Sequence, residues 1–150
     1  MYERKDRWSV GEWMTPNPET VPPDYSVRHA FVKMRREGFR HLLVVENGSL
    51  LGIVTDRDLR RPDISDDLEG WHDFYKLDHD YHVRDIMTSD LVSLTPQDRL
   101  EKAVKYVLDN KFGALPVLDK NDDLIGILTT HDIIRAMSEV LQDFGDVLRK

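Results

Sequence analysis

The sequence contains no cysteine among its 150 residues and no long run of apolar residues. The first absence excludes disulfide bonds and a cysteine nucleophile. The second argues against a membrane span, which needs about 20 consecutive, mostly apolar residues. The N-terminal stretch MYERKDRW also lacks the apolar segment of a secretory signal. We therefore expect a cytoplasmic protein that makes no use of a membrane.

An excess of basic residues is also lacking, because the formal net charge is −7. Proteins that bind duplex nucleic acid usually carry a surplus of Lys and Arg, which neutralises phosphates. Nucleic acid is therefore not an expected partner. A small anionic ligand is compatible with this charge, since one or two well-placed cations act at short range.

Catalytic motifs are missing as well, because the sequence has no P-loop, no G-x-G-x-x-G and no nucleophile elbow. We expect a protein that is not an enzyme and requires no cofactor. His72, Asp73 and residues 78–82 (DHDYH) contain metal-ligating side chains. They lie in a polar connector without regular spacing, so a solvated linker is favoured and no metal site is assigned.

The sequence does contain an internal repeat. A displacement of 73 residues aligns Met14-Thr15 with Met87-Thr88, and beyond residue 47 a displacement of 74 aligns GIVTDRDLRR (52–61) with GILTTHDIIR (126–135). The extra residue falls between two turn-like segments, where insertions are tolerated. The predicted organisation is an N-terminal arm (1–9), a first repeat (10–61), a connector (62–82) and a second repeat with a C-terminal helix (83–150).

Both repeats predict the same order of elements. Short strand candidates at 19–21 and 92–94 precede segments with apolar residues at i, i+3, i+4 and i+7, which is typical of a helix with one buried face. Gly38 is placed to end the first of these helices, and Asn47-Gly48 suits a tight hairpin turn. One repeat of about fifty residues cannot cover both faces of its own sheet. We therefore expect a mixed α+β fold of two β-α-β-β-α repeats packed with pseudo-twofold symmetry.

The T-x-x-D segments, Thr55 to Asp58 and Thr129 to Asp132, allow two interpretations. Their spacing matches a capping box, which stabilises the start of a helix by roughly 1 kcal/mol. The same geometry offers backbone N–H groups and the positive end of a helix dipole to an anion. A carboxylate one turn into the helix can also accept hydrogen bonds from both hydroxyls of a ribose. The residues alone leave both interpretations open.

The paired segments VGEWMTPNPETV with GFRHLLVVENGSLLGIVTDRDLRR, and VRDIMTSDLVSLTP with KFGALPVLDKNDDLIGILTTHDIIR, resemble two cystathionine-β-synthase (CBS) domains in tandem, a Bateman module. The resemblance rests on M-T, on G-h-h-T-x-x-D (h, an apolar residue) and on their joint repetition. EWMTPNP and TDRDLR are similar to acetoin-utilisation-type CBS proteins. The printed sequence ends about ten residues past the second repeat, so we expect no ACT domain of the kind that such proteins often carry.

The resemblance implies a regulatory module that binds adenosine nucleotides (AMP, ADP or ATP) between its repeats and controls an unknown protein. A sensor of S-adenosylmethionine is one alternative. Another is a structural dimerisation module in which T-x-x-D only caps helices. The resemblance also implies a disc-like homodimer, with part of the apolar stripe of the last helix packed against the second subunit.

Two ligand sites of unequal strength are expected. Arg40-His41 open the middle strand of the first repeat, whereas Gly113-Ala114 hold the equivalent places in the second, so only the first copy offers cations there. A solvated Arg40 and a packed His41 are the alternative. The stronger site is assigned to Thr20, Val21, Arg40, His41, Ile127, Thr129 and Asp132. The weaker site is assigned to Thr55, Asp58, Ser93 and Leu94.

Overall fold

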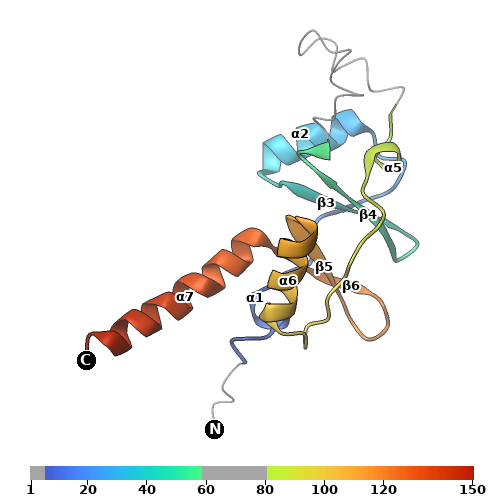
Figure 1. Ribbon diagram of the computed structural model, residues 1–150. Coiled ribbons are helices and arrows are strands. Elements are labelled where there is room, and N and C mark those ends of the chain that lie inside the picture. The colour runs from blue at the N-terminus through green and yellow to red at the C-terminus, as the bar shows by residue number, and fades with distance from the viewer. Residues whose placement is uncertain (1–5, 59–80) are drawn as a thin grey trace. The chain divides into compact units, whose positions relative to one another are not determined.

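The computed structural model describes residues 6–58 and 81–150 (Figure 1). The described residues form two compact units, which we call unit 1 (6–17 and 92–150) and unit 2 (18–58 and 81–91). The expected last helix of the first repeat lies outside the described residues, as do His72, Asp73 and residues 78–80 of the connector. In the described ranges, no helix is both long enough and apolar enough to span a membrane.

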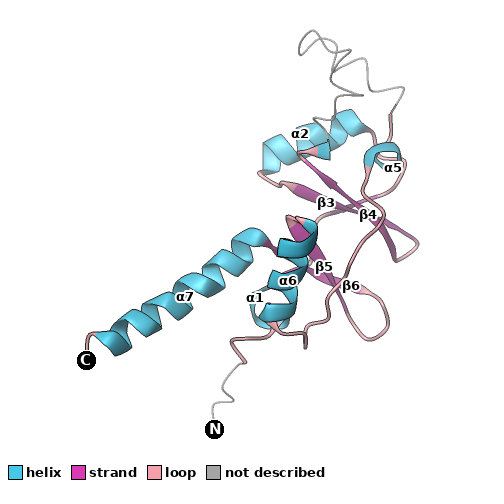
Figure 2. Cartoon of the chain, viewed as in Figure 1, coloured by secondary structure: helices cyan, strands magenta, loops and turns pink. Residues whose placement is uncertain are grey.

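Each unit combines one three-stranded sheet with helices (Figure 2). Unit 1 consists of α1 (Val10–Trp13), β1 (Thr15–Pro16), α6 (Leu100–Asn110), β5 (Ala114–Leu118), β6 (Leu124–Thr129) and α7 (Thr130–Leu148). Unit 2 consists of β2 (Thr20–Val21), α2 (Val27–Glu37), β3 (His41–Glu46), β4 (Ser49–Thr55) and α5 (Val83–Ile86). The strand orders are β1-β6-β5 and β2-β3-β4. The predicted mixed α+β class is confirmed.

Helix α2 ends where the sequence predicts, and its first turn is capped by Ser26. The Ser26 hydroxyl accepts a hydrogen bond from the His29 backbone N–H at 3.0 Å, which satisfies one of the free donors of the first turn. Gly38 ends the helix with φ +75°, a left-handed conformation in which a side chain is strained. Between these caps, Val27, Ala30 and Met34 are buried, as the predicted spacing of apolar residues requires.

The first hairpin also follows its prediction. Asn47 and Gly48 join β3 to β4 with φ values of +50° and +79°, the positive pair that a two-residue hairpin turn needs. The strand expected at 92–94 is different, because in the structure it is reduced to a single parallel bridge between Leu94 and Val117. Its counterpart in the first repeat forms β2, which runs parallel to β3.

The compact units do not follow the sequence repeats. Strand β1, from the start of the first repeat, pairs antiparallel with β6 of the second repeat, with Thr15 opposite Ile127 and Pro16 opposite Gly126. Thr88, from the start of the second repeat, exchanges two backbone hydrogen bonds with Ile53 of β4, at 3.0 and 2.9 Å. Each repeat therefore gives its first segment to the sheet of the other.

Two glycines allow this exchange. A Cβ atom on Gly52 would lie 2.6 Å from the Met87 sulfur and 2.9 Å from the Thr88 carbonyl oxygen. A Cβ atom on Gly126 would lie 2.6 Å from the Met14 sulfur. The M-T and G-h-h-T segments, which the sequence shows only as repeated motifs, are thus packing partners, each Met-Thr lying on the glycine of the opposite repeat.

We predict that Gly52→Ala lowers the free energy of unfolding by about 1–3 kcal/mol, the usual cost of overpacking. The Met87 side chain can move aside, but the Thr88 carbonyl is fixed by its hydrogen bond from Ile53. Urea denaturation measures the effect, with Ser49→Ala at the exposed start of the same strand as the control. Equal stability of the two variants would contradict a tight approach at Gly52.

Candidate functional site

The second T-x-x-D segment forms the start of α7. The Asp132 backbone N–H donates to the Thr129 hydroxyl oxygen at 3.2 Å, and the Thr129 backbone N–H donates to Asp132 Oδ2 at 3.0 Å. The Thr129 hydroxyl also donates to Asp132 Oδ2, at 3.0 Å. These bonds satisfy free donors of the first turn. The predicted capping box is confirmed at this position.

The Asp132 carboxylate is nearly buried, with 4% of the residue exposed. Its second oxygen, Oδ1, accepts a hydrogen bond from Arg135 at 3.4 Å, and the Arg135 guanidinium also lies over the Trp13 ring at 5.8 Å. The sequence prediction missed this role of Arg135, although an i, i+3 acid–base pair on a helix is a recognisable signal. With a single long hydrogen bond, Oδ1 retains capacity for a further donor.

The first T-x-x-D segment has the same geometry. The Thr55 backbone N–H donates to Asp58 Oδ2 at 2.9 Å, and the Asp58 N–H donates to the Thr55 hydroxyl oxygen at 3.1 Å. Asp58 is half-buried, and no described residue donates a hydrogen bond to its Oδ1. The reciprocal bonds of the box are therefore present here too, while the helix that it would cap lies outside the described residues.

Arg40 and His41 lie at the same end of the unit 2 sheet as the first box. His41 is directly opposite Thr55 in the register of β3 and β4, and the Asp56 N–H donates to the Arg40 carbonyl at 3.2 Å. Arg40 is exposed and forms no ion pair with another described residue. In unit 1 the equivalent places, beside Thr129, are held by Gly113 and Ala114, so no cation opens β5.

Burial lowers the pKa of His41 below its ordinary value of 6.5, and the neighbouring Arg40 charge lowers it further. Asp56 and Asp58 act in the opposite direction but do not restore the ordinary pKa. His41 is therefore neutral at pH 7 without a ligand. Of the expected cationic pair, only Arg40 carries a full charge, and His41 offers a ring N–H donor instead. The influence of Asp56 was not foreseen from the sequence.

The other predicted residues are divided between the surface and the core. Thr20 and Ser93 are exposed. Val21 is 4% exposed and Leu94 is 1% exposed, and each belongs to the hydrophobic core of its own unit. For these two residues, only the backbone is available to a ligand. Ile127 is 8% exposed and lies in β6.

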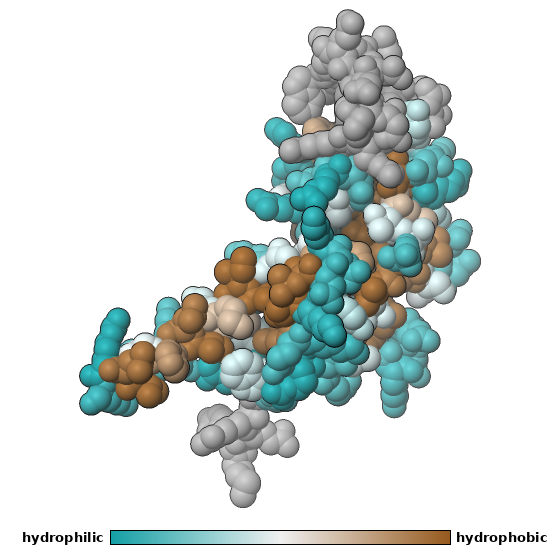
Figure 3. Space-filling model, viewed as in Figure 1, coloured by the Kyte–Doolittle hydropathy of each residue, from teal (hydrophilic) through white to brown (hydrophobic). Residues whose placement is uncertain are grey.

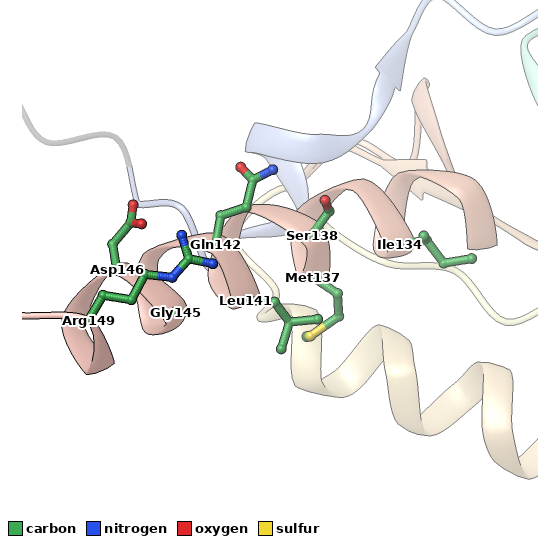
Figure 4. A pocket seen from close by; sticks show the side chains of 8 residues that line it. All are labelled: Ile134, Met137, Ser138, Leu141, Gln142, Gly145, Asp146 and Arg149. Atoms are coloured by element: carbon green, nitrogen blue, oxygen red, sulfur yellow. The ribbon is translucent and has the colours of Figure 1, made fainter.

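No group of three or more His, Asp or Glu side chains suited to a metal ion occurs in the described ranges. His82 is described and pairs with Asp85 at the start of α5. A surface hollow lies along α7 (Figure 4), and none of the predicted site residues lines it. The hollow is therefore a feature separate from the two boxes.

Comparison with known proteins identifies the family. Residues 10–63 and 83–139 match the CBS domain. The chain belongs to the CBS domain family. The predicted tandem pair of CBS domains is confirmed, and the two matched segments contain both T-x-x-D boxes.

Similar CBS proteins include structures with bound nucleotide. CBSX2 of Arabidopsis thaliana, solved in complex with AMP, is 31% identical with a TM-score of 0.73, over 89% of this chain and 98% of that one. A putative acetoin utilization protein, AcuB of Vibrio cholerae, is 29% identical with a TM-score of 0.73. The match covers 92% of this chain and 96% of that one. The cytosolic domain of the Mg²⁺ channel MgtE, in complex with ATP, is 25% identical with a TM-score of 0.67. The match covers 88% of this chain and 50% of that one.

This CBS pair is shorter than several of its curated relatives. It spans 44% of one relative that is 30% identical and 66% of another that is 29% identical. The activities of those whole proteins are therefore not carried over from the match.

We predict that His41 makes the protein less stable as pH falls below 6.5. Because the folded-state pKa lies below the unfolded value, the unfolded chain takes up a proton in this range before the folded chain does. Urea denaturation at pH 7.5 and 5.5 should show a smaller loss for His41→Gln than for the wild type. An identical loss in both proteins would contradict a lowered pKa at His41.

Proposed function

We propose that this CBS pair is a non-catalytic regulatory module that binds an adenosine nucleotide: AMP, ADP or ATP. The observation that carries the proposal is the pair of T-x-x-D boxes at the ends of β4 and β6, in the family whose members CBSX2 and MgtE have been solved with AMP and ATP. Both boxes combine backbone N–H groups with a carboxylate that retains acceptor capacity.

The chemistry of such a box suits a ribose phosphate. A carboxylate can accept two hydrogen bonds from neighbouring hydroxyls, as a ribose diol provides. The first turn of a long helix such as α7 (Thr130–Leu148) favours negative charge through its backbone N–H groups and its dipole. Hydroxyl recognition by the Asp and anion recognition by the helix start therefore occur within one turn.

The sequence-based assignment gives two sites. The stronger combines Thr20, Val21, Arg40 and His41 with Ile127, Thr129 and Asp132. The weaker combines Thr55 and Asp58 with Ser93 and Leu94. In this assignment Asp132 and Asp58 each bind a ribose, and Arg40 binds the phosphate of the stronger ligand.

A second arrangement is favoured by the geometry inside unit 2. His41 lies opposite Thr55, and the charges of Asp56 and Asp58 act on its pKa. Arg40 and His41 would then bind the phosphate of a nucleotide whose ribose is held by Asp58.

Two alternatives compete with nucleotide sensing. The confirmed capping box of α7 is what a purely structural dimerisation module would also show. A sensor of S-adenosylmethionine would use the same ribose contacts but gain little from Arg40, because that ligand carries no phosphate. We further propose a homodimer that acts in the cytoplasm on a partner protein not yet identified.

We predict that Asp132→Asn weakens AMP binding about 10- to 100-fold, because the ribose loses a charged acceptor. Asn keeps the shape of Asp, and its amide oxygen can still accept the Thr129 N–H. Calorimetry gives the affinity. Saturating AMP should raise the melting temperature of the wild type by several degrees, since a hundredfold excess over Kd adds about 2.7 kcal/mol.

Asp58→Asn is the matched variant of the first box. A loss of AMP binding in Asp58→Asn alone would assign the ribose to Asp58 and support the second arrangement. Unchanged affinity in both variants, or no binding of AMP, ADP or ATP by the wild type, would leave only the capping function of the boxes.

We predict that Arg40→Ala weakens AMP binding about tenfold or more and leaves the binding of adenosine unchanged. A hydrogen bond between charged groups is worth about 1.5–3 kcal/mol. Adenosine has no phosphate to form this bond with Arg40, so its affinity does not depend on the arginine. Arg36→Ala, which removes an equal charge from the last turn of α2, is the control. An equal loss for AMP and adenosine would contradict a phosphate contact by Arg40.

A further inference from the structure

Arg135 is the only lysine or arginine of α7 (Thr130–Leu148), a helix that the structure describes in full. Much of the surface along this helix is apolar in the space-filling view (Figure 3). Cations stabilise the C-terminal end of a helix, whereas Arg135 lies in the second turn from the N-terminal end. The helix dipole therefore does not explain the position of Arg135, and the side chains around it have to.

The Arg135 guanidinium connects the second T-x-x-D box to the N-terminal part of unit 1. It lies 3.4 Å from Asp132 Oδ1 and 5.8 Å from the centre of the Trp13 ring. The Trp13 indole N–H in turn donates to the Arg7 carbonyl oxygen at 2.7 Å, which holds the orientation of the ring. Because the Arg135 side chain is 53% exposed, it can leave Asp132 without opening the core.

The hydrogen bonds already present at Asp132 limit what a ligand can add. A carboxylate oxygen offers about two lone-pair sites, and each hydroxyl of a ribose brings one O–H donor. Oδ2 already accepts from the Thr129 N–H and from the Thr129 hydroxyl, each at 3.0 Å. Oδ1 accepts from Arg135, which leaves about one further site on that oxygen. In this arrangement both hydroxyls of a diol can bind Oδ1 only when Arg135 has left it.

The number of hydroxyls on the sugar then decides whether Arg135 stays. A 2′-deoxyribose keeps only its 3′-hydroxyl, which fits the remaining site of Oδ1 beside the guanidinium. A ribose needs both sites and so competes with Arg135 for Asp132. Because the same guanidinium is attracted to the face of the Trp13 ring, its departure from Asp132 also changes what the ring contacts.

We infer that Arg135 is a built-in competitor of the ligand at Asp132: a ribose diol displaces its guanidinium from Oδ1, and the displacement changes the surroundings of Trp13. This inference rests on the nucleotide binding proposed above and names the regulation of that site. Arg135 lowers the affinity of the box for a diol. It also converts occupancy of the box into a change in the N-terminal part of unit 1.

Arg135→Ala tests the competition through the ratio of two dissociation constants, that of 2′-deoxy-AMP divided by that of AMP. The ratio measured by calorimetry should rise about two- to fivefold, the range spanned by the loss of a surface ion pair. Both ligands carry the same phosphate, so the effect of the lost charge cancels. Lys105→Ala, which removes an exposed charge from α6, should leave the ratio unchanged. An unchanged ratio in Arg135→Ala, or a lower one, would overturn the inference.

Tryptophan fluorescence tests the displacement itself. The sequence contains three tryptophans, so Trp8→Phe with Trp71→Phe leaves only Trp13. In this background AMP should shift the emission of Trp13 and 2′-deoxy-AMP should not, and Arg135→Ala should abolish the response to AMP. A response to AMP that persists without Arg135 would overturn the inference.

The two proposals fail in different ways. If the wild type binds neither AMP nor 2′-deoxy-AMP in calorimetry, the proposed function fails and this inference fails with it. If both nucleotides bind and the ratio of their dissociation constants is the same with and without Arg135, only this inference fails.

Discussion

The structure depends on the close approach of each Met-Thr segment to the glycine of the opposite repeat. Gly52 and Gly126 leave room for the Met87 and Met14 side chains, and in unit 2 two backbone hydrogen bonds join Thr88 to Ile53. Because these contacts complete each sheet with chain from the other repeat, neither repeat can form its native unit alone. The duplicated sequence therefore folds as one interdependent pair.

This exchange also positions the boxes. Three residues after each glycine the strand ends in a threonine, and the T-x-x-D box follows at once, in β4 at Thr55 and in β6 at Thr129. The strand that the Met-Thr segment contacts is thus the strand that delivers the box. An invading side chain at either glycine would disturb both the sheet and the box that follows it.

Local features were predictable because local spacing determines them. The Asn47-Gly48 turn, the Gly38 helix end and the hydrogen bonds of both T-x-x-D boxes depend on residues within four positions of each other. The exchange of first segments was not predictable, since nothing in the periodicity of β1 states that its partner is β6. The lowered pKa of His41 was not predictable either, because it depends on burial and on Asp56, and only the folded sheet brings these together. Arg40 illustrates a middle case: its charge is evident from the sequence, but its position beside the first box is not.

The proposed ligand chemistry reaches the start of α7. Asp132 holds the first turn of this helix through Thr129. A ribose that takes up the free capacity of Asp132 would compete with Arg135 for Oδ1, and the Arg135 guanidinium also lies over the Trp13 ring of α1. Binding at Asp132 would therefore change the contacts of the first turns of α7 and their contact with α1. Should Asp58 hold the ribose instead, this direct route is absent. The identity of the binding carboxylate therefore decides whether the ligand acts on α7.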